Sequence, residues 1–153
     1  MEDINKAVAV LGTLILAHRR RIKAYFSLCE MTSHEEIRSF CERHINHSQQ
    51  IVNNLSKWRS AYGGFAKTLD KPAATDIWHQ LRLILSLNAE KTVISRCEQL
   101  ERETLKMYQV AMPLIPSSAA GDLQLHVKTL EMMVRTLQDF GERKQMRNLL
   151  NPS

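Results

Sequence analysis

Residues 33–64, SHEEIRSFCERHINHSQQIVNNLSKWRSAYGG, decide the fold. Ser33 and Glu36 have the capping-box spacing that opens a helix, and the Gly63-Gly64 pair favours the left-handed turn that ends one. Between these signals, apolar and small residues recur in alternating steps of four and three, which keeps them on one helical face. They are Ile37, Cys41, His44, Ser48, Ile51, Leu55, Trp58 and Tyr62. The pattern predicts a long amphipathic helix that packs in a bundle.

The same alternation marks three further segments. The first begins near Asp3 and carries Ile4, Val8, Leu11, Ile15, His18, Ile22, Tyr25 and Cys29. The third begins near Thr75 or Asp76 and, after a predicted break near Asn88, carries Ile94, Cys97, Glu101, Leu105, Tyr108 and Met112. The fourth follows Pro116, has Ser117 or Ser118 as its cap, and carries Leu123, Val127, Leu130, Val134 and Leu137. We therefore predict an all-α, antiparallel four-helix bundle.

The connections refine this prediction. Residues 63–74, which include Pro72, predict a long crossover between the second and third helices rather than a tight hairpin. The apolar pattern of the fourth helix ends at Gly141. We therefore expect one bundle domain over residues 1–141 and a polar C-terminal tail over residues 142–153.

Composition fits a single domain without a membrane segment. The chain has 153 residues with 44% hydrophobic residues, and its 5 glycines and 4 prolines leave room for long helices. The apolar stretch 8–16 is too short to span a bilayer and lacks the flanks of a signal peptide. Three cysteines at irregular spacing give no disulfide framework. We expect a cytoplasmic protein with free thiols.

Two short motifs resemble a known family. The stretch Arg96-Cys97-Glu98-Gln99-Leu100-Glu101, followed by Lys106-Met107-Tyr108, resembles the Cys-Glu-x-Gly-Glu…Tyr signature of a bacterial family of uncharacterised ferritin-like proteins. Arg21-Ile22-Lys23-Ala24-Tyr25 resembles the Arg-Ile-x-Gly-Tyr element of that family. The resemblance implies a ferritin-like bundle of unassigned activity, with stress-associated proteins among the relatives. Leu100 and Ala24 replace glycines of the family pattern, which changes the packing expected there.

A ferritin-like bundle raises the question of a metal site. A di-iron site needs a Glu-x-x-His pair on each of two helices, and the sequence contains no such pair. The candidate ligands are His18, His44, Glu98 and Glu101, with His126 at the edge of its stripe. We interpret these residues as a hydrogen-bonded polar layer in the core, with no metal or other cofactor and no catalytic residue. A degenerate metal or redox site in the same place is the alternative.

The net charge of +5, from 21 basic and 16 acidic residues, does not identify a partner. Arg19-Arg20-Arg21 with Lys23 forms a basic cluster that we place on the outside of the first helix. Weak nucleic-acid binding through this face is a second alternative, but no helix-turn-helix, zinc or base-stacking signature supports it. We expect a non-enzymatic bundle that acts through protein–protein contacts and forms a homodimer, by analogy with ferritin-like bundles.

Overall fold

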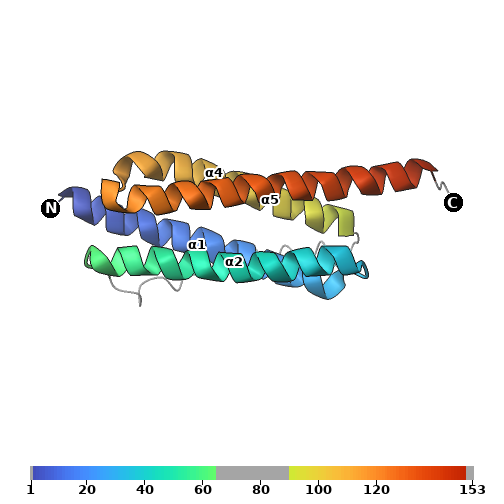
Figure 1. Ribbon diagram of the computed structural model, residues 1–153, viewed down its shortest axis with the longest axis horizontal. Helices are drawn as coiled ribbons and strands as arrows, with labels where there is room; N and C mark the ends of the chain where they lie inside the picture. The colour runs from blue at the N-terminus through green and yellow to red at the C-terminus, as the bar shows by residue number, and fades with distance from the viewer. Residues whose placement is uncertain (1, 65–89, 151–153) are drawn as a thin grey trace.

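The computed structural model of the chain describes residues 2–64 and 90–150, and within this part every regular element is a helix (Figure 1). The elements are α1 (Glu2–Met31), α2 (Glu35–Ala61), α4 (Glu90–Ala111), the short 3-10 helix η2 (Met112–Leu114) and α5 (Ser117–Leu150). The predicted all-α class and four long helices are thereby confirmed.

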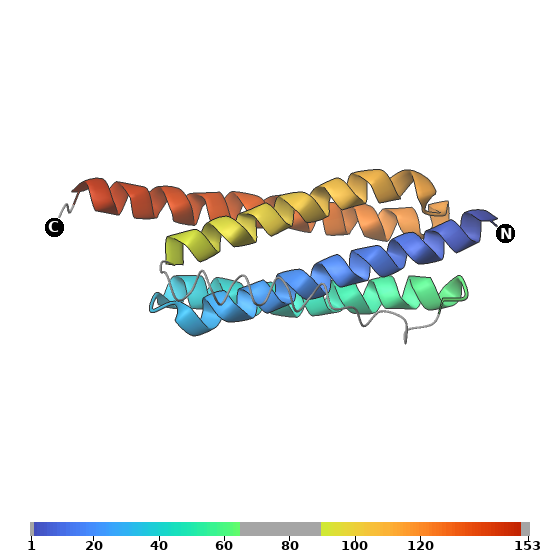
Figure 2. The same ribbon diagram turned by 180° about the vertical axis from the view of Figure 1, so that it is seen from behind.

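The helices pack in pairs to form an elongated bundle. α1 lies against α2, and α4 lies against α5, with each pair antiparallel. α1 also packs on α4 and joins the two pairs, as the view from behind shows (Figure 2). α2 and α4 both begin at the same end of the bundle, so these two helices run in the same direction.

The core consists of the faces that the helical spacing predicts. In α1 and α2 the buried residues include Leu11, Ile15, Ile22, Tyr25, Ile37, Cys41, Ile51 and Leu55. In α4 and α5 they include Ile94, Cys97, Tyr108, Leu123, Leu130 and Leu137. Ile4 departs from the prediction, because 46% of its surface is exposed near the start of α1. Burial of these apolar faces is the main stabilising term of such a bundle.

One predicted helix boundary is wrong. The capping box of Ser33 and Glu36 does not form, because α2 begins at Glu35 with His34 as its N-cap residue and without a side-chain cap bond. The amide of His34 instead donates to Thr32 Oγ1 at 3.1 Å. At the other end of the chain, α5 continues through Gly141 to Leu150, since one glycine weakens a helix by only about 1 kcal/mol.

Two other boundaries follow the sequence. α2 ends at Ala61, and Gly63 has a φ of 95°, the left-handed conformation that glycine adopts readily. α4 ends in η2, which contains Pro113. The rest of the predicted crossover to residue 74, the helix start near Thr75 and the break near Asn88 lie outside the described residues. No helix of the described part is long and apolar enough to cross a membrane.

Candidate functional site

A buried ion pair lies at the centre of the bundle and joins α1 to α4. Arg21 Nη2 and Arg21 Nε lie 2.8 Å and 3.0 Å from Glu101 Oε1, and neither side chain is exposed. Burial alone would raise the pKa of Glu101, but the charge of Arg21 and the hydrogen bond from His44 outweigh it and lower that pKa to about 2. The carboxyl group is therefore ionised at neutral pH and balances the guanidinium charge.

Two more side chains reach the same carboxylate oxygen. Tyr25 donates its hydroxyl to Glu101 Oε1 at 2.7 Å, and His44 Nε2 lies 2.9 Å from that oxygen. His44 Nε2 also lies 2.5 Å from Arg21 Nη2. A guanidinium can only donate, so His44 Nε2 either accepts from Arg21 or donates to Glu101. Burial and then the nearby charge of Glu101 raise the pKa of Tyr25, which keeps its proton on the hydroxyl.

A second arm of hydrogen bonds leads from Arg21 to α5. Arg21 Nη1 lies 2.5 Å from His18 Nδ1, and His18 Nε2 lies 2.7 Å from the hydroxyl of Tyr108. That hydroxyl lies 3.1 Å from His126 Nδ1. We call Arg21, Glu101, His44, Tyr25, His18, Tyr108 and His126 the polar layer. It links α1, α2, α4 and α5, with each member less than 10% exposed.

The histidines of the polar layer are neutral at neutral pH. Burial lowers the pKa of His18 well below its usual value, and the charge of Arg21 adds to this effect. Burial also lowers the pKa of His44, and it lowers the pKa of His126 to about 4. The layer therefore holds one positive charge, on Arg21, and one negative charge, on Glu101.

Hydrogen bonding in this region is uneven. Glu101 Oε1 has four nitrogen or oxygen atoms within 3.0 Å, whereas Glu101 Oε2, His44 Nδ1 and Ser48 Oγ are buried and have no hydrogen-bond partner among the described residues. A buried polar atom without a partner costs about 1–3 kcal/mol. The polar layer thus gives up some stability for a specific arrangement of polar groups, which is common where such groups set helix register or serve a function.

The structure brings together three of the four candidate ligands that the sequence indicated. His18, His44 and Glu101 all lie within 3.0 Å of Arg21 nitrogens. Glu98 lies outside the layer and instead accepts from Arg102, four residues along α4, at 3.0 Å. His126, which the spacing placed at the edge of its helix stripe, joins the layer through Tyr108.

Arg21 corrects one prediction. We placed it in the outer basic cluster, but its side chain is fully buried, whereas Arg19 and Arg20 are partly exposed and Lys23 is exposed. The sequence does carry a signal for this position. Leu14, Ala17, Arg21, Ala24 and Leu28 recur in steps of three and four, and all of them are buried. The arginine therefore lies on a second inward stripe of α1, next to the predicted one.

The residues of the polar layer do not fit a metal ion. A metal ligand must direct a lone pair at the cation, but here His18 Nδ1 and Glu101 Oε1 face a guanidinium that is permanently charged. Within the described part of the chain, no three His, Cys, Asp or Glu side chains are grouped so that they can hold one. Arg21 thus occupies the position in which a cation would balance Glu101.

None of the three cysteines forms a disulfide. Cys41 and Cys97 are buried in the core, and Cys29 is partly exposed. Burial raises the pKa of Cys97 well above its usual value, so its thiol stays protonated and weakly nucleophilic. Small apolar packing is therefore the role that the structure gives Cys97.

Comparisons with known proteins found no match for this chain among protein families, curated proteins or solved structures.

Proposed function

We propose that this protein is a ferritin-like four-helix scaffold without catalytic activity, which acts through contacts with other proteins, including a second copy of itself. The observation that carries the proposal is the position of Arg21 among His18, His44 and Glu101. In ferritin-like metalloproteins, Glu and His side chains at the bundle centre surround cations. Here the chain's own guanidinium supplies the positive charge, so the centre serves to join helices.

The course of the helices supports the ferritin-like assignment. α2 and α4 run in the same direction, so the end of α2 and the start of α4 lie at opposite ends of the bundle (Figure 1). A parallel course of the second and third helices is typical of ferritin-like bundles, which contain one long crossover. This support concerns the type of scaffold, and the role proposed for it rests on its centre and its surface.

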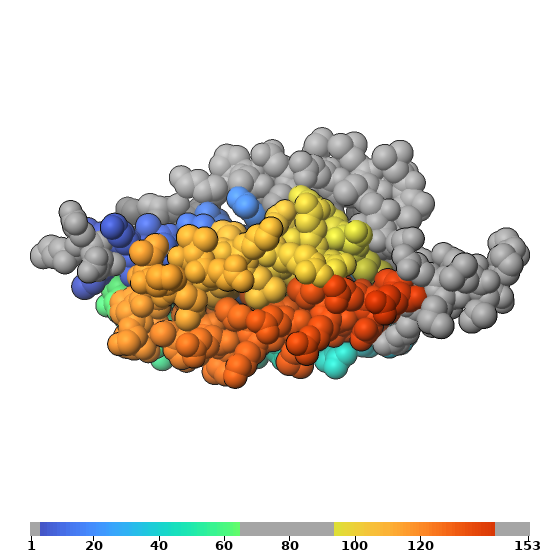
Figure 3. Space-filling model, turned by 90° about the horizontal axis from the view of Figure 1, so that it is seen from above, coloured from blue at the N-terminus to red at the C-terminus, as the bar shows by residue number. Residues whose placement is uncertain are grey.

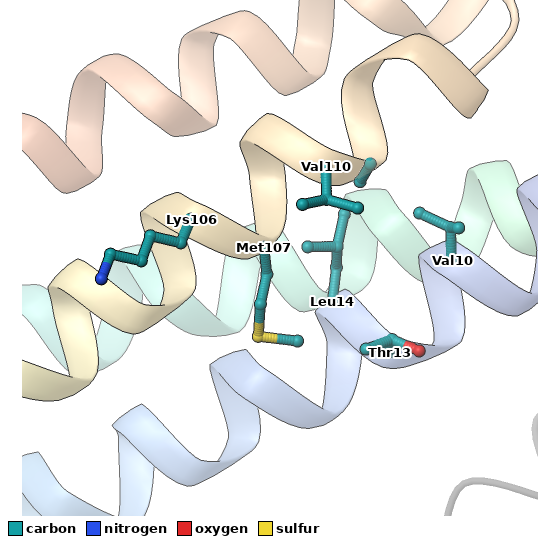
Figure 4. Close-up of a pocket in the computed structure, with 7 residues that line it drawn as sticks. Val10, Thr13, Leu14, Lys106, Met107 and Val110 are labelled. Carbon is teal, nitrogen blue, oxygen red and sulfur yellow. The ribbon is translucent and has the colours of Figure 1, made fainter.

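An apolar groove between α1 and α4 offers a surface for protein contacts. It has a volume of about 300 Å³, and Val10, Leu14, Met107 and Val110 point into the space between the two helices (Figure 4). Val110, which lines this groove, is 73% exposed.

A second apolar surface lies on α5. Leu125 and Met132 are seven residues apart, so they lie on one face of the helix, and they are 62% and 65% exposed. Figure 3 views the bundle from the side on which α4 and α5 lie next to each other. The exposed positions of α2 are polar or charged except for Ala61. Contact between two copies is therefore better served by α4, α5 and the groove than by α2.

Sedimentation velocity over a range of concentrations tests the association. We expect the wild-type protein to form a dimer. If the groove is the contact, Val110→Glu should dissociate the dimer. If the exposed face of α5 is the contact, Leu125→Glu combined with Met132→Glu should dissociate it. Asn53→Glu, at an exposed polar position of α2, is the matched control and should leave the dimer intact. A wild-type protein that sediments as a monomer at every concentration contradicts the homodimer.

The metal content of protein purified without a histidine tag tests the role of the bundle centre. We expect iron, manganese and zinc at levels far below one per chain, because Arg21 occupies the cation position. One equivalent of any of them would favour the alternative, a metal or redox protein. Loss of that metal in His44→Ala would then locate it in the polar layer.

A further inference from the structure

α2 and α5 contact each other at two places along their seam, and a pocket lies between these two contacts. At one end, Asp122 Oδ2 accepts from Asn54 Nδ2 at 3.0 Å and from Trp58 Nε1 at 2.7 Å. Toward the other end, the rings of Phe40 and Phe140 pack edge to face with their centroids 5.3 Å apart. Between these contacts lies a pocket of about 310 Å³, which we call the seam pocket. Its lining residues are His47, Gln50 and Ile51 of α2 and His126 and Thr129 of α5.

His126 connects the seam pocket to the polar layer. Only 7% of the surface of His126 is exposed, yet the residue lines the pocket. Its Nδ1 is engaged by the hydroxyl of Tyr108 at 3.1 Å. The remaining ring nitrogen, Nε2, is therefore the one available to a molecule in the pocket. Whether Nε2 offers a proton or a lone pair decides what kind of ligand the pocket accepts.

The buried arginine fixes this choice through a chain of hydrogen bonds. Arg21 can only donate, so His18 Nδ1 must accept from Arg21 Nη1 and the proton of neutral His18 lies on Nε2. His18 Nε2 then donates to the oxygen of Tyr108, which leaves the Tyr108 hydroxyl to donate to His126 Nδ1. Neutral His126 consequently carries its proton on Nε2.

We propose that the seam pocket is a binding site for a carboxylate group, which accepts a hydrogen bond from His126 Nε2. The exposed side chains of His47 and Gln50 are further hydrogen-bonding groups of the pocket, and Ile51 supplies an apolar wall for the carbon next to the carboxylate. The hydroxyl of Thr129 is already committed, since it donates to the carbonyl of Leu125 at 3.1 Å. The carboxylate can belong to a small metabolite or to an acidic side chain of a peptide.

The direction of the hydrogen bonds from Arg21 to His126 also predicts how the pocket responds to cations. Zinc binds an imidazole through a nitrogen lone pair, and His126 Nε2 has none to offer while Tyr108 donates to Nδ1. Acetate and zinc are thus opposite probes of the same nitrogen. Acetate should bind in the seam pocket, and zinc should not displace the proton on His126.

Nuclear magnetic resonance with nitrogen-15-labelled histidine tests the proposal on the full chain. We expect the proton of His126 on Nε2, and saturable shifts of the His126 and Ile51 signals on addition of sodium acetate but not of sodium chloride. Zinc chloride should leave the His126 signals in place. A blocked glutamyl tripeptide forms a second arm: tighter binding than acetate assigns the site to an acidic side chain, and equal or weaker binding assigns it to a small carboxylate.

Variants locate the effect. Tyr108→Phe removes the donor to His126 Nδ1, so the proton of His126 is no longer held on Nε2. Acetate binding should weaken about twofold or more, because only the fraction of the protein with the proton on Nε2 binds. Tyr25→Phe removes another buried hydroxyl of the polar layer that is not part of this chain, so it should leave acetate binding unchanged. His126→Leu should abolish the acetate-induced shift at Ile51.

Three results would overturn the proposal. One is a wild-type His126 with its proton on Nδ1, a measurement that needs no variant and is unaffected if Tyr108→Phe fails to fold. Another is an acetate titration without saturable shifts at His126 and Ile51. The last is an Ile51 shift that persists in His126→Leu. None of these results depends on whether the chain forms a dimer.

Discussion

Arg21 Nη2 and Glu101 Oε1 lie 2.8 Å apart, and both side chains are fully buried. The two residues are 80 positions apart in the sequence, so their contact fixes how far α1 is shifted along α4. A buried ion pair adds little net stability compared with apolar residues, but breaking one partner leaves a charge in the core. The main contribution of the Arg21–Glu101 pair is to favour one register of α1 along α4 over registers in which either helix is shifted.

Removal of Glu101 alone should destabilise the protein strongly. We expect Glu101→Leu to lower the free energy of unfolding by about 3–5 kcal/mol, because Arg21 is left without its counter-charge in the core. The double variant Arg21→Met with Glu101→Leu should recover most of this loss, since no buried charge remains. Urea unfolding followed by circular dichroism measures both values.

The ion pair between Arg102 and Glu98 on the surface of α4 is the control for this experiment. Arg102 donates to Glu98 at 3.0 Å, with 52% and 25% of their side chains exposed. Arg102→Ala should cost only about 0.3–0.5 kcal/mol, as is usual for a surface pair four residues apart on a helix. Equal losses in Arg102→Ala and Glu101→Leu would contradict the buried position of the Arg21–Glu101 pair.

Stability should fall as the pH drops from about 6.5 toward 4. The pKa of His126 is lowered to about 4 by burial, so below pH 6.5 the unfolded chain takes up a proton that the folded chain does not. For His126 the free energy of unfolding should fall by about 3 kcal/mol over this range. The lowered pKa values of His18 and His44 act in the same direction. The stabilising charge of Glu101 is lost only below about pH 4.5, as its pKa of about 2 is approached.

Urea unfolding at a series of pH values measures this dependence. His126→Gln should make the slope between pH 6.5 and 4 shallower, because one proton fewer is bound on unfolding. Asn53→Gln replaces an exposed residue of α2 that does not titrate and should leave the slope as in the wild type. A wild-type stability that is constant over this range would mean that the three buried histidines titrate normally in the folded protein.

The seam between α2 and α5 depends on Asp122. Hydrogen bonds from Asn54 and then Trp58 lower the pKa of Asp122, so the group accepts both bonds as a carboxylate. Asp122→Ala should lower the free energy of unfolding by about 1–2 kcal/mol, because two donors lose a partly buried acceptor. Asp139→Ala, at an exposed position of α5, is the control and should cost less than about 0.5 kcal/mol.

The helices were predictable because their signals are local. The spacing of Ile37, Cys41 and His44 already defines the buried face of α2, and Gly63 marks its end. The start of α2 was not predictable in the same way. Ser33 has the right spacing for a cap, but the neighbouring Thr32 hydroxyl accepts the bond from His34, and two similar hydroxyl groups cannot be told apart by spacing.

The polar layer was half predictable, for a physical reason. Helical spacing places His18, His44 and Glu101 on inward faces, so their burial follows from each helix alone. The burial of Arg21 does not follow from its helix alone, because charged residues are seldom buried without a partner. Its partner is Glu101 on a helix 80 residues away, and that pairing exists only once α1 and α4 are packed together.

Gly63 and Gly121 offer a matched pair of substitutions with opposite expected signs. A Cβ atom at either glycine would have no heavy atom within 4 Å, so packing does not distinguish the two sites. Gly63 has a φ of 95°, where a side chain is strained, and Gly63→Ala should lower the free energy of unfolding by about 1–2 kcal/mol. Gly121 lies within α5, where alanine is favoured, and Gly121→Ala should raise it by about 0.5–1 kcal/mol. Urea unfolding of the two variants beside the wild type measures the difference, and a change of the same sign in both would mean that the backbone at one of these glycines differs from the one described.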